Sequence, residues 1–227
     1  MSETTRYFTP EFFGFFKELG KNNNKEWFTS NKERYEKAVQ EPAVRFVRDA
    51  GARLKKLSPY LVGDAKPFGG SISRIYRDIR FSPDKSPYKD HIGIHFWHAK
   101  AVGPEHMSPG IFLHLQSGES GAHSGVWHPE APGLTKIRKL IMDEPAAWKK
   151  VLHSNVRLEG ESMKRPPPGI DPNHPMIQDL RRKDFVGTRS FRDNEVTSPD
   201  FLDTFVGTAE AMDPLNAFLA KAIGLPW

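Results

Sequence analysis

The hydrophobic pattern changes its period after about the first 60 residues, and this change restricts the fold more than any other feature of the sequence. Between Phe12 and Leu19, phenylalanine and leucine recur at spacings of three and four residues, which is typical of an amphipathic helix. In the segments 91–97 and 111–116, every second residue is instead Ile, Leu or Phe, which is typical of a half-buried strand. Helical and strand patterns that occupy separate blocks predict an α+β fold.

The blocks follow one another along the chain. We expect a helical part at about residues 1–60, a sheet at about 68–128 and a second helical part at about 130–227. The expected strands are joined by short connections that contain glycine, which favours an antiparallel meander. Helices from the N-terminal and C-terminal parts would cover its apolar face. Because there is no internal repeat and no long linker, the 227 residues predict one α+β domain.

Two details of the C-terminal part extend this prediction. The segment 185–191 has the pattern of one more strand. Ser198-Pro199 and Asp213-Pro214 each combine a capping residue with a proline suited to the first turn of a helix. They predict two final helices.

Composition removes several classes of site. The chain has no cysteine, which excludes disulfides, thiol nucleophiles and cysteine-ligated metals. No apolar run approaches the roughly 20 residues of a membrane helix, and the first residues lack the pattern of a secretory signal. We therefore expect a cytoplasmic protein without membrane contact. The net charge of +5 permits an anionic partner without requiring one.

One segment concentrates fixed charge beside aromatic rings. Residues 74–90 read RIYRDIRFSPDKSPYKD, with five cations, three carboxylates and three aromatic rings. The cations are Arg74, Arg77, Arg80, Lys85 and Lys89, and the carboxylates are Asp78, Asp84 and Asp90. A turn near Ser82-Pro83-Asp84 would bring the lysines back towards the arginines.

The pattern R-x-x-R-D-x-R-F-x-x-D-K-x-x-Y, from Arg74 to Tyr88, resembles the motif of a bacterial and fungal family known as domain of unknown function 2461. Trp27-Phe28, the GIFLHLQSG segment at 110–118 and Gly125-Val126-Trp127 resemble the same family. The resemblance spans almost the whole chain. It implies a shared folding unit, and it implies no reaction or cofactor.

The first interpretation of the charged segment is a ligand site. Arginine presents a planar fork of donors that matches carboxylate or phosphate, and aromatic rings can wall such a site. The expected ligand-binding residues are Arg74, Arg77, Arg80, Lys85, Tyr88 and Lys89. The expected ligand is anionic, either a small molecule that contains phosphate or single-stranded nucleic acid.

Two alternatives stay open at this stage. In one, the chain is an enzyme that acts on phosphate esters. Asp78 or Asp84 would be the acid, base or metal ligand, with His114 or Tyr88 assisting. In the other, Asp78 and Asp84 pair with the cations, and the segment is an internal ion-pair network of a structural or interaction domain. No metal site is predicted from the histidines, since His91 and His95 would lie roughly 13 Å apart on a strand.

Overall fold

A computed structural model describes residues 5–101, 108–154 and 156–227. Its centre is an open six-stranded sheet with the strand order β1-β2-β3-β4-β6-β5, in which all neighbouring strands are antiparallel. The strands are β1 (Leu61–Val62), β2 (Ile92–His98), β3 (Gly110–Leu115), β4 (Ser120–Val126), β5 (Arg157–Glu159) and β6 (Phe185–Phe191). Strands β1 to β4 follow chain order, as the meander prediction requires, and β6 matches the strand predicted at 185–191.

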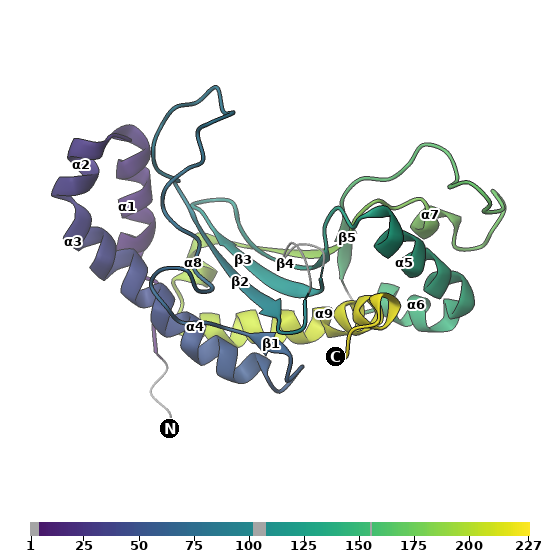
Figure 1. Cartoon of the computed structure of the whole chain (residues 1–227). Helices are drawn as coiled ribbons and strands as arrows, with labels where there is room; N and C mark the ends of the chain where they lie inside the picture. The colour runs from purple at the N-terminus through teal and green to yellow at the C-terminus, as the bar shows by residue number, and fades with distance from the viewer. Residues whose placement is uncertain (1–4, 102–107, 155) are drawn as a thin grey trace.

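Two long helices, α4 (Glu41–Leu54) and α9 (Phe201–Ile223), cover one face of the sheet (Figure 1). The alternation in β2 turns Ile92, Ile94 and Phe96 towards these helices, and all three side chains are buried. The Phe96 ring packs against Phe205 of α9 at 5.7 Å between ring centroids. The predicted α+β class, with helices of both chain ends on the apolar face, is therefore confirmed. Among the described residues no helix covers the opposite face of the sheet, and we call this face the open face (Figure 1).

Groups of short elements stand at the two ends of the sheet (Figure 1). The N-terminal wing contains α1 (Pro10–Lys21), α2 (Lys25–Ser30), α3 (Lys32–Tyr35) and the π-helical turn η1 (Glu36–Gln40). The C-terminal wing contains α5 (Ala131–Asp143), α6 (Pro145–Leu152) and α7 (Ile177–Leu180). A further short helix, α8 (Asp193–Val196), links β6 to α9. Each wing has its own apolar cluster, and the cluster of the N-terminal wing continues beneath the sheet.

The prediction of two final helices is wrong, because α9 runs without a break through Pro214. Proline lacks a backbone N–H, so the carbonyl of Glu210 loses its helical partner. Both residues lie on the exposed side of the helix, where water can satisfy that carbonyl. The buried side of α9 keeps its contacts with the sheet, and this packing outweighs the local stop signal.

Candidate functional site

The open face carries a row of rings that runs across the sheet. Strand register places His95 opposite Phe112, Phe112 opposite His123, and His123 opposite Thr188. Ring centroids lie 6.3 Å apart for His95 and Phe112 and 6.4 Å apart for Phe112 and His123. Trp97 continues the series, with its ring centroid 6.3 Å from that of His95. We call Trp97, His95, Phe112 and His123 the aromatic row.

Two glycines let these rings lie close to the backbone. A Cβ atom at Gly93 would lie 2.6 Å from Cζ of Phe112, and one at Gly110 would lie 3.0 Å from Nε2 of His95. Both distances are too short for a side chain without displacement of the neighbouring ring. The glycines thus let the rings of Phe112 and His95 lie close against the backbone of the sheet. A space lies above the row.

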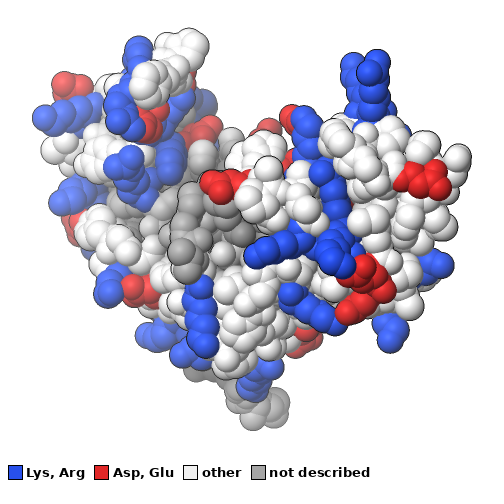
Figure 2. All heavy atoms as spheres, turned by 45° about the vertical axis from the view of Figure 1, so that its right-hand side comes forward, with Lys and Arg blue, Asp and Glu red and all other residues white. Residues whose placement is uncertain are grey.

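That space is a cavity of about 700 Å³. Ser71 and Ser73 line it on the side of the N-terminal wing, and Trp127, Glu159 and Gly160 line it on the side of the C-terminal wing. Its size lies within the usual range of small-molecule sites. Figure 2 shows the surface dipping between two masses, with Lys and Arg side chains gathered on both. We call this cavity the groove.

A buried carboxylate holds the C-terminal wall of the groove. Asp184 is fully buried, and its Oδ1 accepts hydrogen bonds from the backbone N–H and Nδ1 of His128, at 2.8 and 2.6 Å. Its Oδ2 accepts from the backbone N–H of Glu161 at 2.8 Å. His128 has a φ of 48°, a left-handed conformation that costs energy in a residue other than glycine. Asp184 therefore ties together the two segments that supply Trp127 and Gly160.

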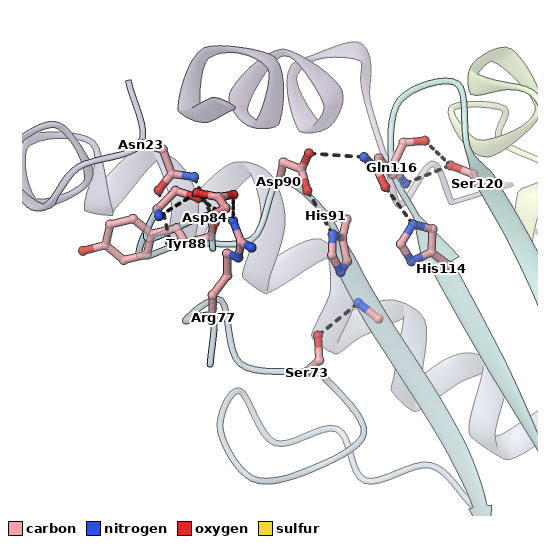
Figure 3. A network of polar contacts seen from close by, with 12 residues as sticks. Asn23, Ser73, Arg77, Asp84, Tyr88, Asp90, His91, His114, Gln116 and Ser120 are labelled. Atoms are coloured by element: carbon pink, nitrogen blue, oxygen red, sulfur yellow. Dashed lines mark hydrogen bonds and ion pairs between the residues drawn. The ribbon is translucent and has the colours of Figure 1, made fainter. Parts of the chain in front are cut away.

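The charged segment forms a projecting two-stranded arm, residues 74–90. Its base is an antiparallel bridge between Tyr76 and Tyr88, and the side-chain amide of Asn23 exchanges two hydrogen bonds with the backbone of Tyr88 (Figure 3). The Tyr88 ring is 4% exposed and stacks on Phe28 at 4.2 Å between centroids. Tyr88, an expected ligand-binding residue, thus anchors the arm to the N-terminal wing.

Most cations of the arm already have internal partners. Arg77 donates to Asp84 and to Ser86 (Figure 3), and Arg80 forms an ion pair with Asp78 at 2.6 Å.

Nζ of Lys85 donates to the backbone carbonyl of Ile79 at 2.9 Å. Hydrogen bonds from the backbone N–H of Ser86 and from Arg77 lower the pKa of Asp84 to about 2, and the hydrogen bond from Arg80 lowers the pKa of Asp78. Both carboxyl groups are therefore charged at neutral pH and poorly suited to accept a proton.

Arg74 and Lys89 differ from the other three cations. Within the described ranges, neither side chain forms a hydrogen bond or an ion pair. Burial lowers the pKa of Lys89, and the nearby positive charge of Arg74 lowers it further. The charge of Arg74 helps to lower the pKa of Asp78, although the two side chains form no ion pair. An external anion would stabilise these two neighbouring cations.

The arm joins β2 through a bulge. Between the bridge Tyr76–Tyr88 and the bridge Ile72–Ile94, residues 73–75 of one strand face residues 89–93 of the other, so the β2 side is two residues longer. The hydroxyl of Ser73 accepts a hydrogen bond from the backbone N–H of Gly93 at 3.1 Å within this irregular stretch. Bulges re-aim side chains, and this one carries Asp90 and His91.

The bulge brings His91 next to His114, the histidine singled out from the sequence. Their ring centroids lie 4.7 Å apart. Asp90 Oδ1 lies 3.0 Å from Nδ1 of His91, and Asp90 Oδ2 accepts from Nε2 of Gln116 at 3.2 Å. Oε1 of Gln116 lies 3.0 Å from Nε2 of His114 (Figure 3). His114 therefore belongs to a network with Asp90, and Asp78 and Asp84 lie elsewhere, in the ion pairs of the arm.

Sequence reasoning missed the aromatic row and the role of His91. The alternation of β2 and β3 places His91, His95 and Phe112 on the face away from the apolar residues, and that signal was available. Register between strands, however, decides which of these side chains become neighbours. The bulge that pairs His91 with His114 has no sequence pattern of its own.

The described residues include no group of three or more His, Asp or Glu arranged to hold a metal ion. They also include no helix that is long and apolar enough to cross a membrane. The chain matches no curated protein and no solved structure. Residues 11–218 match the family model described as conserved hypothetical protein (DUF2461). This match covers most of the chain, and the protein therefore belongs to the DUF2461 family of conserved hypothetical proteins.

Proposed function

We propose that the protein is a binding domain for nucleotide units, supplied by a small nucleotide or by single-stranded nucleic acid. In this proposal the groove holds the flat base, and Arg74 and Lys89 contact the phosphate. The observation that carries the proposal is the aromatic row, which lies close over Gly93 and Gly110 and lines a cavity of about 700 Å³.

Stacking supports the first half of the proposal. Phe112 lies at the centre of the row, is 37% exposed and has a histidine on each side. Burial lowers the pKa of His123, so this ring is mostly neutral at neutral pH and presents an uncharged face. Each base that stacks on such a ring contributes about 1–3 kcal/mol to the free energy of binding, whatever the nucleotide sequence.

Charge supports the second half. The positive charge of Lys89 lowers the pKa of His91, which means that Lys89 lies close to the end of the sheet where His91 and His114 meet. Arg74 directly follows Ser73, which lines the groove, and its charge lowers the pKa of Lys89, so the two cations lie close to each other. A phosphate bound there would neutralise two cations that form no hydrogen bond or ion pair within the described residues.

The alternative with Asp78 or Asp84 as acid or base has less support. Each carboxylate is held ionised by an arginine on an exposed part of the arm. These pairs favour the internal-network interpretation for Arg77 and Arg80, and they leave Arg74 and Lys89 for a ligand.

Fluorescence anisotropy of a labelled single-stranded DNA oligonucleotide tests the proposal, with an unlabelled mononucleotide as competitor. Phe112→Ala should weaken binding about five- to 150-fold, the equivalent of about 1–3 kcal/mol. Leu152→Ala is a matched control, because Leu152 is exposed to a similar extent (38%) on α6, away from the groove, and it should leave affinity unchanged.

Salt dependence tests the role of the cations, and competition distinguishes a small nucleotide from single-stranded nucleic acid as the ligand. Each phosphate contact with a single strand contributes about −0.7 to the slope of log affinity against log salt. Lys89→Gln should therefore make the slope shallower by about 0.7, whereas Lys139→Gln, on the exposed surface of α5, should not change it. Competition by the mononucleotide at comparable concentration indicates a single-nucleotide site. Failure of both ligands to bind would contradict the proposal.

A further inference from the structure

The contacts around the bulge fix the tautomer of His91. Asp90 is a carboxylate and only accepts hydrogen bonds, so Nδ1 of His91 carries the proton that lies between them. In the neutral ring, Nε2 therefore holds a lone pair. Figure 3 shows this nitrogen on the side of the ring away from Asp90, towards Ser73. Ser73 and Gly93 both line the groove.

The same carboxylate orients the neighbouring ring. Because Nε2 of Gln116 donates to Asp90, its Oε1 must accept, and Nε2 of His114 is the donor. One carboxylate thus sets the orientation of two histidines, the second through a glutamine. Burial lowers the pKa of His91, and the neighbouring His114 and Lys89 lower it further, against the opposing effect of Asp90. His91 is therefore mostly neutral at neutral pH and able to accept a proton.

We propose that His91 is the general base of a phosphodiester cleavage in which the substrate is single-stranded RNA bound along the groove. This inference rests on the proposed nucleotide binding and adds a reaction at its edge, because His91 lies next to the groove-lining Ser73 and Gly93 and is not itself among the lining residues. RNA brings its own nucleophile, the ribose 2′-hydroxyl, so the protein has to supply a base and stabilise negative charge on the phosphate. His91 supplies the base, Asp90 positions it, and Lys89 and Arg74 are the neighbouring cations.

The step balances without any further reactant. Nε2 of His91 takes the proton of the 2′-hydroxyl as the 2′-oxygen forms a bond to phosphorus. The bond from phosphorus to the 5′-oxygen breaks, and that oxygen takes a proton from solvent. His91 then returns its proton to solvent. The products are a strand that ends in a 2′,3′-cyclic phosphate and a strand that begins with a 5′-hydroxyl.

The test substrate is a single-stranded DNA oligonucleotide that contains one ribonucleotide, so that a single bond can react. We expect cleavage at that bond, with a 2′,3′-cyclic phosphate identified by mass spectrometry. The all-DNA oligonucleotide and its 2′-O-methyl counterpart should bind and stay intact, because neither offers the nucleophile.

Variants assign the base. His91→Gln should lower the single-turnover rate at least about a hundredfold, the usual contribution of general-base catalysis, while anisotropy with all-DNA shows retained binding. His153→Gln, at the end of α6 and outside the groove, is the matched control and should react at the unaltered rate. Purification of all variants by one protocol also controls for contaminating nuclease.

The pH profile distinguishes a base from a structural residue. The rate should rise with pH as His91 loses its proton. Asp90→Asn removes a carboxylate that raises the pKa of His91, so the rising limb should move to lower pH while the maximal rate falls. Lys89→Gln removes a charge that lowers the pKa of His91, so the rising limb of the pH–rate profile of this variant should move to higher pH.

The outcomes separate the two proposals. Binding of all-DNA without cleavage of the ribonucleotide substrate, or cleavage that survives His91→Gln, would overturn the catalytic inference and leave the binding proposal standing. Absence of binding to any oligonucleotide or nucleotide would overturn both.

Discussion

Replacement of Asp184 by alanine is the sharpest stability test of the groove wall. Asp184 has no exposed surface, and its two oxygens accept from the backbone N–H groups of His128 and Glu161 and from the His128 ring. Gly160 lies against it, so close that a Cβ there would lie 2.3 Å from Cβ of Asp184. The carboxylate is therefore closely enclosed and accepts all three of these hydrogen bonds.

The magnitude follows from the donors that alanine would leave without an acceptor. Two backbone N–H groups lose their partner, at about 1–3 kcal/mol each when water cannot replace it. Both donors are only partly buried, which favours the lower half of that range. We expect Asp184→Ala to lower the free energy of unfolding by about 2–4 kcal/mol. The left-handed backbone of His128 would relax once its acceptor is gone, so oligonucleotide affinity should fall as well.

Urea unfolding followed by circular dichroism measures the loss. Asp143→Ala provides the matched control, because Asp143 forms an exposed pair with Lys139 on α5 and should contribute at most about 0.5 kcal/mol. A loss for Asp184→Ala no larger than that for Asp143→Ala would refute the reasoning. It would mean that water replaces the carboxylate without cost, and that the wall does not depend on this residue.

Two further predictions concern the groove floor and the alkaline limit of stability. Gly93→Ala should displace the Phe112 ring, because its Cζ would lie 2.6 Å from the new Cβ. The variant should therefore bind the oligonucleotide more weakly in the same anisotropy assay. Unchanged affinity would show that binding does not depend on the position of this ring. Burial raises the pKa values of Tyr7 and Tyr35 to about 12, so the stability they contribute is complete below pH about 10 and is lost as pH rises through about 12. Spectrophotometric titration should find tyrosine groups that ionise only in that range, and ordinary ionisation of all tyrosines near pH 10 would contradict this.

The fold could be anticipated because local pattern and tertiary packing agree over most of the chain. Pro10 begins α1, and the alternation of β2 buries Ile92, Ile94 and Phe96 against α4 and α9. Pro214 is the instructive exception. Its dihedral angle and missing N–H suit a helix start, yet α9 is buried on both sides of it. Phe205 and Ala209 before it pack in the cluster beneath the sheet, and Leu215 and Leu219 after it pack in the cluster of the C-terminal wing. Where local helix propensity and tertiary packing favour different structures, the packing energy determines the outcome. The sequence alone does not show how much buried surface a segment will gain from tertiary contacts.

The candidate site could be anticipated only in part, because charge pattern identifies cations without their partners. Arg77 and Arg80 are as prominent in the sequence as Arg74, yet both have carboxylates of the arm beside them. Pairing depends on how the arm closes on itself. The aromatic row depends on register across β2, β3 and β4, which aligns residues far apart in the chain.

The bulge lies between the arm and the groove, and under the proposed function this gives the charged segment a role that neither an isolated ion-pair network nor an isolated anion site would have. The ion pairs of Arg77 and Arg80 close the outer part of the arm, while Asn23 and Phe28 hold its base through Tyr88. With both ends fixed, the two extra residues on the β2 side have to bulge out at the edge of the open face. Asp90 and His91 lie in that bulge. The internal network is therefore compatible with the proposed site, because the closed arm leads into the bulge that carries His91 beside His114, and it leaves Arg74 and Lys89 without a hydrogen bond or ion pair in the described residues.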